Sequence, residues 1–393
     1  MTCSFAKFDA GSSVKKKLLF IATTPFAVNA FLRTHLLALS DEYQVILCVN
    51  LLVYPISEDL HEKINIEHVD IVRKISPIKD LHALYQLLRI FLRTRPEAVH
   101  SITPKAGLLA MLAASLAGVP HRFHTFTGQV WATKKGLGRW LLKILDRLIA
   151  ISATQVFADS ASQCRLLETE KIVGKGEVSV LGPGSISGVD IKRFRPNSEI
   201  RNTERHIAGT LPTTLVFLFL GRLAKDKGVF DLLHAYSSVA TQHPQVELWV
   251  VGPDDEHLLA ELQTLGAKGQ GRIRWCESTT QPERFMAAAD VLVLPSYREG
   301  FGSVVIEAAA CAIPALAYRI DGIVDAVMDN KTGLLVPVGN VGALASAMLQ
   351  LCEDRDLLQR LGEQACARAI HDFASNSVTA AWAELYHTQL HAR

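Results

Sequence analysis

The stretch Pro295-Ser-Tyr-Arg-Glu-Gly-Phe-Gly-Ser-Val-Val-Ile-Glu307 follows directly on the apolar run from Val291 to Leu294. A short apolar run that ends at a proline is typical of a strand buried on both faces. From Ser303 onward the apolar residues recur with helical period. We therefore predict a strand–loop–helix unit, with one carboxylate, Glu299, on the loop and a second, Glu307, early in the helix.

The loop of this unit has features that suit a ligand. Gly300 and Gly302 allow a ligand to approach the backbone closely. The free N–H groups at the helix start, on Ser303 and Val304, suit a phosphate. Acidic residues near a helix start are common for a simpler reason, because the positive end of the helix dipole stabilises their negative charge. The carboxylate pair alone does not establish a site.

A second element upstream points to the same chemistry. Val216 to Leu220 is another continuous apolar run, and it leads into Gly221-Arg-Leu-Ala-Lys-Asp-Lys-Gly228 and then a helical pattern. Arg222 and Lys227 thus follow a buried strand, at the edge where open α/β sheets bind ligands. Two fixed cations suit a diphosphate, and nearby carboxylates suit sugar hydroxyls. The combination predicts a nucleotide-sugar site.

Together the two motifs resemble the retaining nucleotide-sugar glycosyltransferases of the GT-B fold, the large fourth family of sequence classifications. The resemblance implies that Arg222 and Lys227 hold the donor diphosphate. It also implies that Glu299 contacts the donor sugar near the reacting carbon, and that Glu307 holds ribose hydroxyls. Arg222, Lys227 and Glu299 are then the catalytic residues. The remaining donor-binding residues that we expect are Gly221, Gly252, Pro253, Trp275, Gly300, Phe301, Gly302, Ser303 and Val304.

Length and composition agree with this fold class. A chain of 393 residues that is 49% hydrophobic and 20% charged is long enough for two globular α/β domains. Runs of strand and helical pattern alternate along it, which favours parallel sheets covered on both faces. We expect an acceptor-binding Rossmann-like domain over 1–195 and a donor-binding Rossmann-like domain over 196–375. By the resemblance, a last helix at about 376–393 packs back on the first domain.

The sequence also indicates a compartment. Its 7 cysteines are scattered without a Cys-x-x-Cys pair, so neither a zinc site nor a disulfide framework is expected, and a reducing cytoplasm is the default. We recognise no signal peptide, and no apolar stretch reaches the roughly 18–20 residues that a spanning helix needs. No metal or other cofactor is expected, because the two cations can take the role of a metal at the diphosphate.

Charge is unevenly distributed between the two halves. Residues 1–195 contain 25 Lys and Arg against 16 Asp and Glu, whereas the rest contains 16 against 23. A basic first half favours an anionic partner, such as a membrane surface or a phosphorylated acceptor. We recognise no nucleic-acid-binding motif, so a nucleic acid is not expected.

The acceptor side is predicted less directly. The family often has paired glycines in the loop after the first strand, where this chain has Phe26 and Asn29 instead. Many members also have a histidine just before Gly128, where this chain has Thr127. A lone histidine on a strand is more often packed in the core than bound to a ligand, and both alternatives stay open for His124. The acceptor-binding residues that we expect are Phe26, Asn29, Lys105, His124, Thr127 and Gly128.

A basic, tryptophan-containing segment runs from Trp131 to Ile149. Its cations, Lys134, Lys135, Arg139, Lys143 and Arg147, alternate with Trp131, Trp140 and several leucines. An ordinary surface helix with its apolar stripe in the core explains this pattern as well as a membrane contact does. In the second case the aromatic and apolar residues would enter the headgroup region, and the cations would contact anionic lipid.

We predict a retaining glycosyltransferase that moves a sugar, an N-acetylated or deoxy amino hexose, from a UDP-sugar to a saccharide linked to polyprenyl diphosphate. The resemblance places it in bacterial surface polysaccharide synthesis, such as O-antigen in lipopolysaccharide, at the inner face of the cytoplasmic membrane. One alternative is a GT-B nucleotide-sugar epimerase or hydrolase. Another is a non-catalytic scaffold for polysaccharide assembly. A nicotinamide enzyme is disfavoured, because the glycines of 182–188 lack the dinucleotide-binding spacing.

Overall fold

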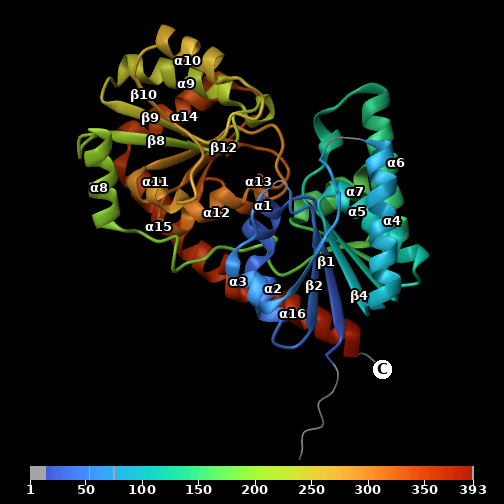
Figure 1. Cartoon of the computed structure of the whole chain (residues 1–393). Helices are drawn as coiled ribbons and strands as arrows, with labels where there is room; N and C mark the ends of the chain where they lie inside the picture. Colours follow the sequence, from blue (N-terminus) through green and yellow to red (C-terminus); the bar gives the residue numbers. More distant parts are fainter. Residues whose placement is uncertain (1–14, 53, 74–75, 392–393) are drawn as a thin grey trace, which may run out of the picture.

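The computed structural model describes residues 15–52, 54–73 and 76–391. Figure 1 shows two α/β units side by side, each built on one twisted sheet. The first sheet has seven strands in the order β3-β2-β1-β4-β5-β6-β7, and the second has six in the order β10-β9-β8-β11-β12-β13. Neighbouring strands pair in parallel, as in β1 with β2 and β8 with β9. The predicted GT-B arrangement of two Rossmann-like sheets is confirmed.

The strands of the first sheet are β1 Lys17–Ile21, β2 Gln44–Val49, β3 Asn65–His68, β4 Ala98–Ile102, β5 His121–Phe126, β6 Gln155–Ala158 and β7 Val178–Val180. Those of the second are β8 Leu215–Leu220, β9 Val246–Val251, β10 Arg272–Cys276, β11 Val291–Leu294, β12 Ala315–Tyr318 and β13 Gly333–Val336.

The helices of the first unit are α1 Pro25–Ala27, η1 Val28–Leu32, α2 Arg33–Leu39, α3 Glu58–Lys63, α4 Pro77–Thr94, α5 Pro104–Leu116, η2 Val130–Thr133, α6 Gly136–Ser152 and α7 Ala161–Thr169. The following helices are α8 Ser198–Ala208, η3 Lys225–Lys227, α9 Val229–Gln242, α10 Leu259–Lys268, α11 Pro282–Ala288, α12 Ser303–Ala310, α13 Ile323–Ala326, α14 Val341–Glu353, α15 Arg355–Phe373 and α16 Ser375–His391.

The two apolar runs that anchored the sequence analysis are central strands. β8 and β11 are neighbours in the second sheet and bury side chains on both faces. Phe217 and Val293 enter the core under α9 and α14, while Leu218 and Leu292 enter the core under α11 and α12. Continuous apolar strands of this kind are what a parallel sheet covered by helices requires.

Some elements were not predicted. The helical segment after β1 contains a turn of π-helix, η1, between α1 and α2. β3 is an edge strand with a mixed, half-exposed sequence, and neither it nor α3 has a strong periodic pattern. α8 is polar on most of its surface and packs on α11.

The chain crosses between the two units twice, at adjacent places. The N–H of Val189 donates to the carbonyl of Phe373 (2.7 Å), and the N–H of Ser375 donates to the carbonyl of Val189 (2.8 Å). Val189 and Phe194 pack in a core of the second sheet, so the chain has already left the first unit before residue 195. The division at 195 and 196 stays a prediction.

Helix α16 leaves the second crossing and returns to the first sheet, where Figure 1 shows it below β1 and β2. It packs on α2, and Trp382 and Tyr386 are fully buried. The imidazole of His100 on β4 lies between them: its ring stacks on Trp382 at 4.6 Å, and its Nδ1 is 2.6 Å from the Tyr386 hydroxyl.

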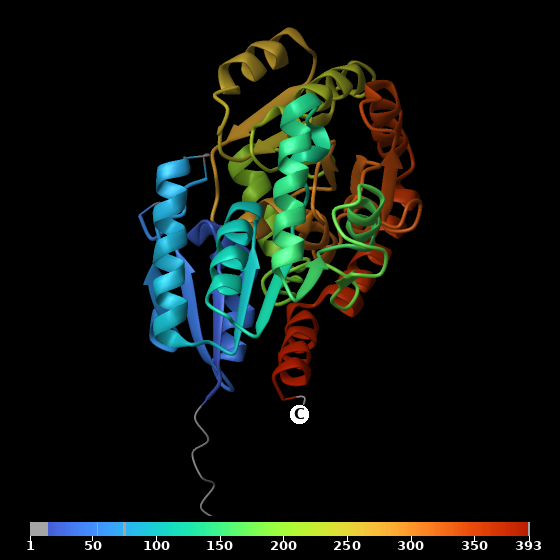
Figure 2. The same ribbon diagram turned by 90° about the vertical axis from the view of Figure 1, so that its right-hand side faces the viewer.

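Helices α4, α5 and α6 cover the other face of the first sheet, the face turned toward the viewer in Figure 2. α5 lies between the other two and is apolar on nearly all sides. Within the described ranges, no helix combines the length and apolar character needed to cross a bilayer.

Candidate active site

The loops that follow β8, β9 and β10 meet at the carboxyl edge of the second sheet. The N–H of Leu223 donates to the carbonyl of Pro253 (2.8 Å), and the N–H of Gly252 donates to the carbonyl of Cys276 (3.2 Å). Gly252 has a φ of +151°, and a Cβ there would lie 1.9 Å from the carbonyl oxygen of Gly221. Only glycine permits this approach, so three of the predicted donor-side residues are neighbours.

Lys227 and Glu299 come from different strands and form an ion pair. The Lys227 Nζ lies 2.6 Å from Glu299 Oε1, and the two side chains are 15% and 14% exposed. Lys227 is in the short helix η3 after β8, and Glu299 is in the loop after β11. A carboxylate and an ammonium at this distance form a charge-assisted hydrogen bond. The sequence prediction that these two groups share one site agrees with this arrangement.

Arg222 is less firmly held. Its guanidinium lies 3.5 Å from Asp255 and 3.9 Å from Asp226. Asp226 is bound more closely by Arg298, at 2.9 Å. A cation with only long contacts keeps donors available for an anionic ligand.

Helix α12 begins beside this ion pair and has no side-chain cap. Its N-cap residue, Gly302, has a φ of +77°, and a Cβ there would lie 2.5 Å from the Ile323 side chain. The backbone N–H groups of Ser303 and Val304 therefore form the open, positive end of this helix. Glu299, the partner of Lys227, lies four residues before this helix start.

Glu307 lies one turn into α12. Burial raises the pKa of its carboxyl to about 7, against the opposing effect of Arg193, which favours the charged form. A carboxyl that changes charge near neutral pH is unusual and is often found at functional sites.

Two of the predicted donor contacts have side chains that face the interior. Phe301 is buried, and its ring meets that of Phe373 at 5.2 Å. Trp275 is partly buried in the core under α9 and α10, and it lies against Gly266. For Phe301 the prediction needs correction, because a buried ring leaves only the backbone to a ligand.

In the first unit, some of the predicted acceptor residues have exposed side chains, and others already bond to neighbouring residues. Phe26 is 62% exposed and meets Tyr54 edge to face. Both ends of the Asn29 amide bind the segment 55–57, through the carbonyl of Pro55 and the backbone and hydroxyl of Ser57. Lys105 pairs with Asp80 at 2.6 Å. Asn29 and Lys105 thus have structural partners already.

His124 is a core residue, and its assignment to an acceptor contact was wrong. Its ring is fully buried, its Nδ1 is 2.8 Å from the Ser101 hydroxyl, and it packs against Gly107 of α5. Burial lowers the pKa of this imidazole to about 3, so it is neutral at physiological pH. The alternative of a packed histidine was the correct one.

Trp131 is likewise removed from any membrane contact. It is 1% exposed, lies in η2 rather than in α6, and its indole N–H donates to Asp146 Oδ2 (2.7 Å). Arg139 and Lys143 lie over its ring and pair with Glu170 (2.7 and 2.8 Å). Arg147 donates to backbone carbonyls at Glu170 and Lys171. Of the predicted residues, Lys134, Lys135 and Trp140 are the exposed ones.

The start of α7 in the first unit is hydrogen-bonded to the loop of the second unit that carries Glu299. The Gln163 amide donates to the carbonyl of Glu299 (3.1 Å), and the Ser160 hydroxyl donates to the carbonyl of Gly300 (3.2 Å). The Ser162 hydroxyl accepts from the N–H of Gly322 (2.6 Å). We call this set of contacts the α7 latch.

Two more contacts join the same parts of the two units. The Ser162 N–H donates to Asp325 Oδ2 (2.9 Å). A Cβ on Gly128, whose φ is +84°, would lie 2.8 Å from the N of Gly300, so the two loops touch through their backbones. Gly128 and Thr127 therefore lie against the loop that carries Glu299.

Asp159 sits beneath the latch at the end of β6. Burial, with smaller contributions from the charges of Glu299 and Asp325, raises the pKa of its carboxyl to about 8. A Cβ on Gly300 would lie 2.3 Å from Asp159 Oδ2. The sequence gives no signal for Asp159, Ser162 or Gln163, because each gains its neighbours only through the meeting of the two units.

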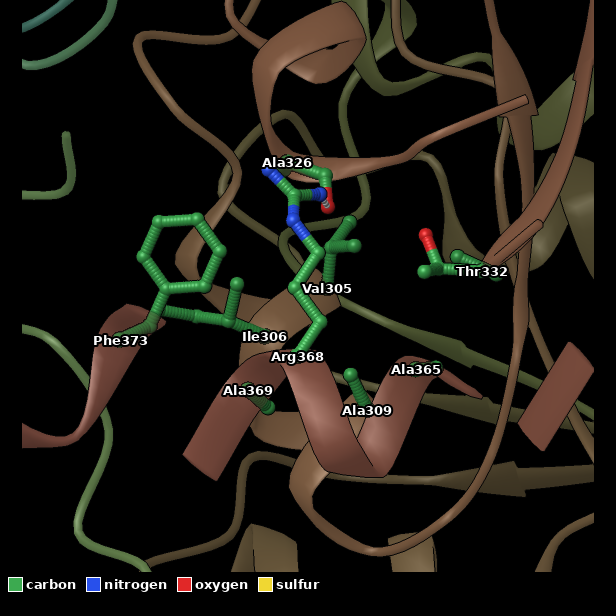
Figure 3. A pocket seen from close by; sticks show the side chains of 10 residues that line it. Val305, Ile306, Ala309, Ala326, Thr332, Ala365, Arg368, Ala369 and Phe373 are labelled. Carbon is green, nitrogen blue, oxygen red and sulfur yellow. Dashed lines mark hydrogen bonds between the residues drawn. The ribbon is translucent and has the colours of Figure 1, made fainter. Parts of the chain in front are cut away.

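Within the second unit, α15 holds the end of α13, the helix that carries Asp325. Figure 3 shows Arg368 of α15 reaching between Ala326 and Phe373. Its guanidinium donates to the carbonyls of Asp325 (2.7 Å) and Ala326 (2.8 Å) and lies over the Phe373 ring. The hollow around these side chains has a volume of about 10 Å³, room for a water molecule at most. It is part of the scaffold.

No cluster of three or more His, Cys, Asp or Glu side chains within the described ranges is arranged to hold a metal ion.

Comparison with known families accounts for both units. A family described as "Glycosyl transferases group 1" matches residues 201–368, and one described as "Glycosyl transferase 4-like domain" matches residues 31–184.

Three relatives illustrate the similarity. The capsular polysaccharide biosynthesis glycosyltransferase CapM of Staphylococcus aureus is 28% identical over 81% of this chain and 83% of its own length. D-inositol 3-phosphate glycosyltransferase 2 of Catenulispora acidiphila is 30% identical over 74% of this chain and 70% of its own. The UDP-Gal:alpha-D-GlcNAc-diphosphoundecaprenol alpha-1,3-galactosyltransferase of Escherichia coli is 25% identical over 72% of this chain and 74% of its own.

Solved structures show the same fold. Sucrose-phosphate synthase from Thermosynechococcus elongatus superposes with a TM-score of 0.80 at 21% identity, over 96% of this chain and all of that one. HepE from Anabaena, in complex with UDP and glucose, gives 0.77 at 19% identity, over 95% of this chain and all of that one. With the family matches on both units and the Lys227–Glu299 pair at the start of α12, the chain belongs to the retaining group 1 glycosyltransferases of the GT-B fold.

Proposed function

We propose that this chain transfers a sugar, an N-acetylated or deoxy amino hexose, from a UDP-sugar to a saccharide carried on polyprenyl diphosphate. The pathway is the synthesis of a bacterial surface polysaccharide. The observation that carries the donor half of the proposal is the Lys227–Glu299 ion pair at 2.6 Å beside the uncapped start of α12. Such a site offers cations and N–H groups to a diphosphate, and a carboxylate to sugar hydroxyls.

The proposed chemistry is electrostatic. As the bond between the sugar and the diphosphate breaks, negative charge grows on the phosphate oxygens, and Arg222, Lys227 and the Ser303 and Val304 N–H groups stabilise it. Fixed donors aimed at developing charge are usually the largest single contribution to catalysis. We assign no general base among the described side chains near Glu299, and in this proposal the departing phosphate accepts the proton of the acceptor hydroxyl. Glu299 orients the sugar, and Glu307 holds the ribose.

Support for the acceptor comes from the relatives and from charge. CapM acts in capsular polysaccharide biosynthesis, and the E. coli relative uses a diphosphoundecaprenol-linked GlcNAc, as their names state. The first 195 residues carry the excess of Lys and Arg, 25 against 16 acidic residues. An anionic, lipid-linked substrate is the class of acceptor that these observations favour.

A membrane-facing surface is part of the proposal, in a form revised by the structure. α6 exposes Leu137 (84%), Trp140 (60%) and Ile151 (80%) along one side, and α4 exposes Ile78 (86%) and Leu81 (68%). Figure 2 shows the two helices on the same face of the first unit. Exposed apolar side chains at helical spacing, with Lys134 and Lys135 next to them, suit the headgroup region of an anionic bilayer.

The test of the donor and acceptor is release of nucleoside diphosphate from a panel of sugar nucleotides. Each is incubated with and without a GlcNAc-diphosphate polyprenol, beside Glu299→Ala and Lys227→Ala. Release that requires the acceptor and both side chains supports the transferase. Release or isomerisation without acceptor would favour the hydrolase or epimerase alternative. Normal folding without donor binding or turnover would favour a scaffold.

The membrane surface has a separate test. Sedimentation with vesicles of phosphatidylglycerol and phosphatidylethanolamine is compared for the wild type, Leu137→Ser/Trp140→Ser and, as a control on another face, Leu211→Ser. Loss of sedimentation only in the α6 variant is expected. Equal sedimentation of all three proteins would contradict a membrane role for α6.

A further inference from the structure

A pocket of about 350 Å³ lies between the two units, on the side of the catalytic loop where η2 and α7 meet it. Glu299 forms part of its wall, so the pocket adjoins the donor site. Its volume is within the range of small-molecule sites. The first unit contributes Gln129, Ala132, Gln163 and Leu166 to the lining.

Gln129 is the unusual member of this lining. It is 1% exposed, yet neither its amide nitrogen nor its amide oxygen has a hydrogen-bond partner among the described residues. The amide oxygen of Gln163, which is 2% exposed, also lacks a partner, while its nitrogen binds the loop at Glu299. Buried amides without partners are costly and rare in proteins. Two of them in the wall of one pocket indicate that a polar ligand completes them.

The charges around the pocket point to a neutral ligand. Arg298 is paired with Asp226, and Arg319 is paired with Asp329. Asp321 adds a carboxyl whose pKa is raised by burial. Because both guanidinium groups in the lining are already paired and an acidic group is present, a phosphate or a carboxylate would meet no unpaired cation among the residues that line the pocket. This separates the pocket from the diphosphate site at Arg222 and Lys227.

Both hydrogen-bonding and apolar side chains line the pocket, and a sugar ring needs both for its hydroxyl groups and its C–H face. The carboxamides of Gln129 and Gln163 can donate to and accept from hydroxyl groups. Leu166, Ile320 and Val324 supply apolar surface for the C–H face of a ring. A hydroxyl-rich ring uses both kinds of surface at once.

We propose that this pocket is the subsite for the sugar ring of the acceptor, and that Gln129 is its recognition residue. The inference rests on the proposed transferase function and makes it more specific. The acceptor ring would then bind on the η2 and α7 side of the Glu299 loop, and the charged part of the acceptor would lie elsewhere.

Gln129→Leu removes the amide and keeps most of the volume. The loss of one or two hydrogen bonds to a bound hydroxyl should raise the acceptor KM about tenfold. The donor KM should change less than about twofold, because a substitution has little effect on a site with which it shares no contacts. The melting temperature should stay level or rise, because burying leucine instead of an unpartnered amide removes a desolvation cost. Gln350→Leu, the same change at an exposed site on α14, is the control.

Ala132→Trp tests the pocket independently, since Ala132 is exposed at the rim and a tryptophan there would fill the opening. Direct binding is measured by saturation-transfer NMR with methyl α-glycosides of GlcNAc and galactose in the presence of UDP. This readout needs no lipid-linked acceptor, so it separates failure of the subsite from failure of the proposed function.

Saturation transfer to a methyl glycoside in the wild type, weakened in Gln129→Leu and in Ala132→Trp, is the expected result. Equal transfer in all three proteins would overturn the proposal, as would an unchanged acceptor KM, which would mean that the pocket holds only water. A lower melting temperature with parallel loss of donor and acceptor binding would make Gln129 a structural residue and would also overturn it.

Discussion

At the scale of single residues, the Lys227–Glu299 pair has two roles that can be separated by mutation. Lys227→Ala removes a donor to the leaving diphosphate, and we expect kcat to fall about 10²–10³-fold, as for the loss of one preorganised donor. Lys225→Ala is the matched control, because Lys225 is exposed and lies two residues away. The assay is diphosphate release under saturating acceptor. Equal losses in both variants would show that the effect is not specific to Lys227.

The raised pKa of Glu307 predicts how donor binding responds to pH. With a pKa of about 7, the carboxyl is neutral in much of the protein at pH 6 and ionised at pH 8. An ionised carboxylate binds hydroxyl groups more strongly than a neutral acid does, so affinity for a UDP-sugar should rise roughly three- to tenfold over this interval. Glu307→Gln should give a flat profile once the titration of the ligand itself, common to both proteins, is subtracted. Calorimetry at three pH values checks this, and parallel profiles for both proteins would exclude Glu307 as the cause.

At the scale of elements, α16 is expected to stabilise the first unit and not the second. Trp382 and Tyr386 fill the space beside β1 and β4, where they enclose His100. Trp382→Ala should cost about 3–5 kcal/mol, the usual range for a large buried aromatic residue. Hydrogen exchange should show faster exchange in β1 and β4, with β8 and β11 unaffected. Trp140→Ala on α6 is the control with the same substitution at an exposed position, and similar losses in both would refute the prediction.

The elements also show what a sequence can predict. β8 and β11 were predicted correctly because long apolar runs between loops have few structural alternatives to a central parallel strand. β3 was missed because an edge strand with one exposed face needs no such run. Trp131 was assigned to the surface because its spacing fits the apolar stripe of α6, whereas the helix begins only at Gly136.

The candidate site divides in the same way. Glu299, Glu307, Arg222 and Lys227 could be placed from sequence, since each follows a recognisable strand or opens a helix. The α7 latch could not, because its partners are more than a hundred residues away and the contacts form only when the two units meet. Gln129 could not either, because its burial without a hydrogen-bond partner has no signature in the sequence. His124 shows the limit of residue type as a signal, because chemistry that suits a ligand also suits a core hydrogen bond.

At the scale of the whole molecule, the buried carboxyl of Asp159 predicts that the contact between the two units at the α7 latch weakens at alkaline pH. Its pKa is raised to about 8 from the ordinary 3.8, so its stabilising effect on the closed form is complete below pH 3.8 and is lost as the pH rises through 8. Above that pH Asp159 adds a third negative charge to those of Glu299 and Asp325, and the Lys227 ammonium is already paired with Glu299. The α7 latch should therefore open.

Small-angle X-ray scattering measures this directly. The radius of gyration of the wild type should increase between pH 7 and pH 9.5, and that of Asp159→Asn should not. Reversal on return to pH 7 distinguishes opening from unfolding. An identical increase in the variant would assign the change to other groups.

The paired crossings at Val189 and Ala374 have a mechanical consequence. Both connections between the units pass through one spot, where Val189 and the backbone on either side of Ala374 are hydrogen-bonded to each other. We therefore expect any rotation of one unit relative to the other to take place about this single pair of connections as a pivot. The first crossing follows β7, whereas Arg73 follows β3 at the opposite edge of the same sheet and faces Asp255 at 3.8 Å. A small turn at the pivot would move Arg73 and Asp255 apart by a long arc and shift Phe301, which touches Phe373 next to the pivot, only slightly.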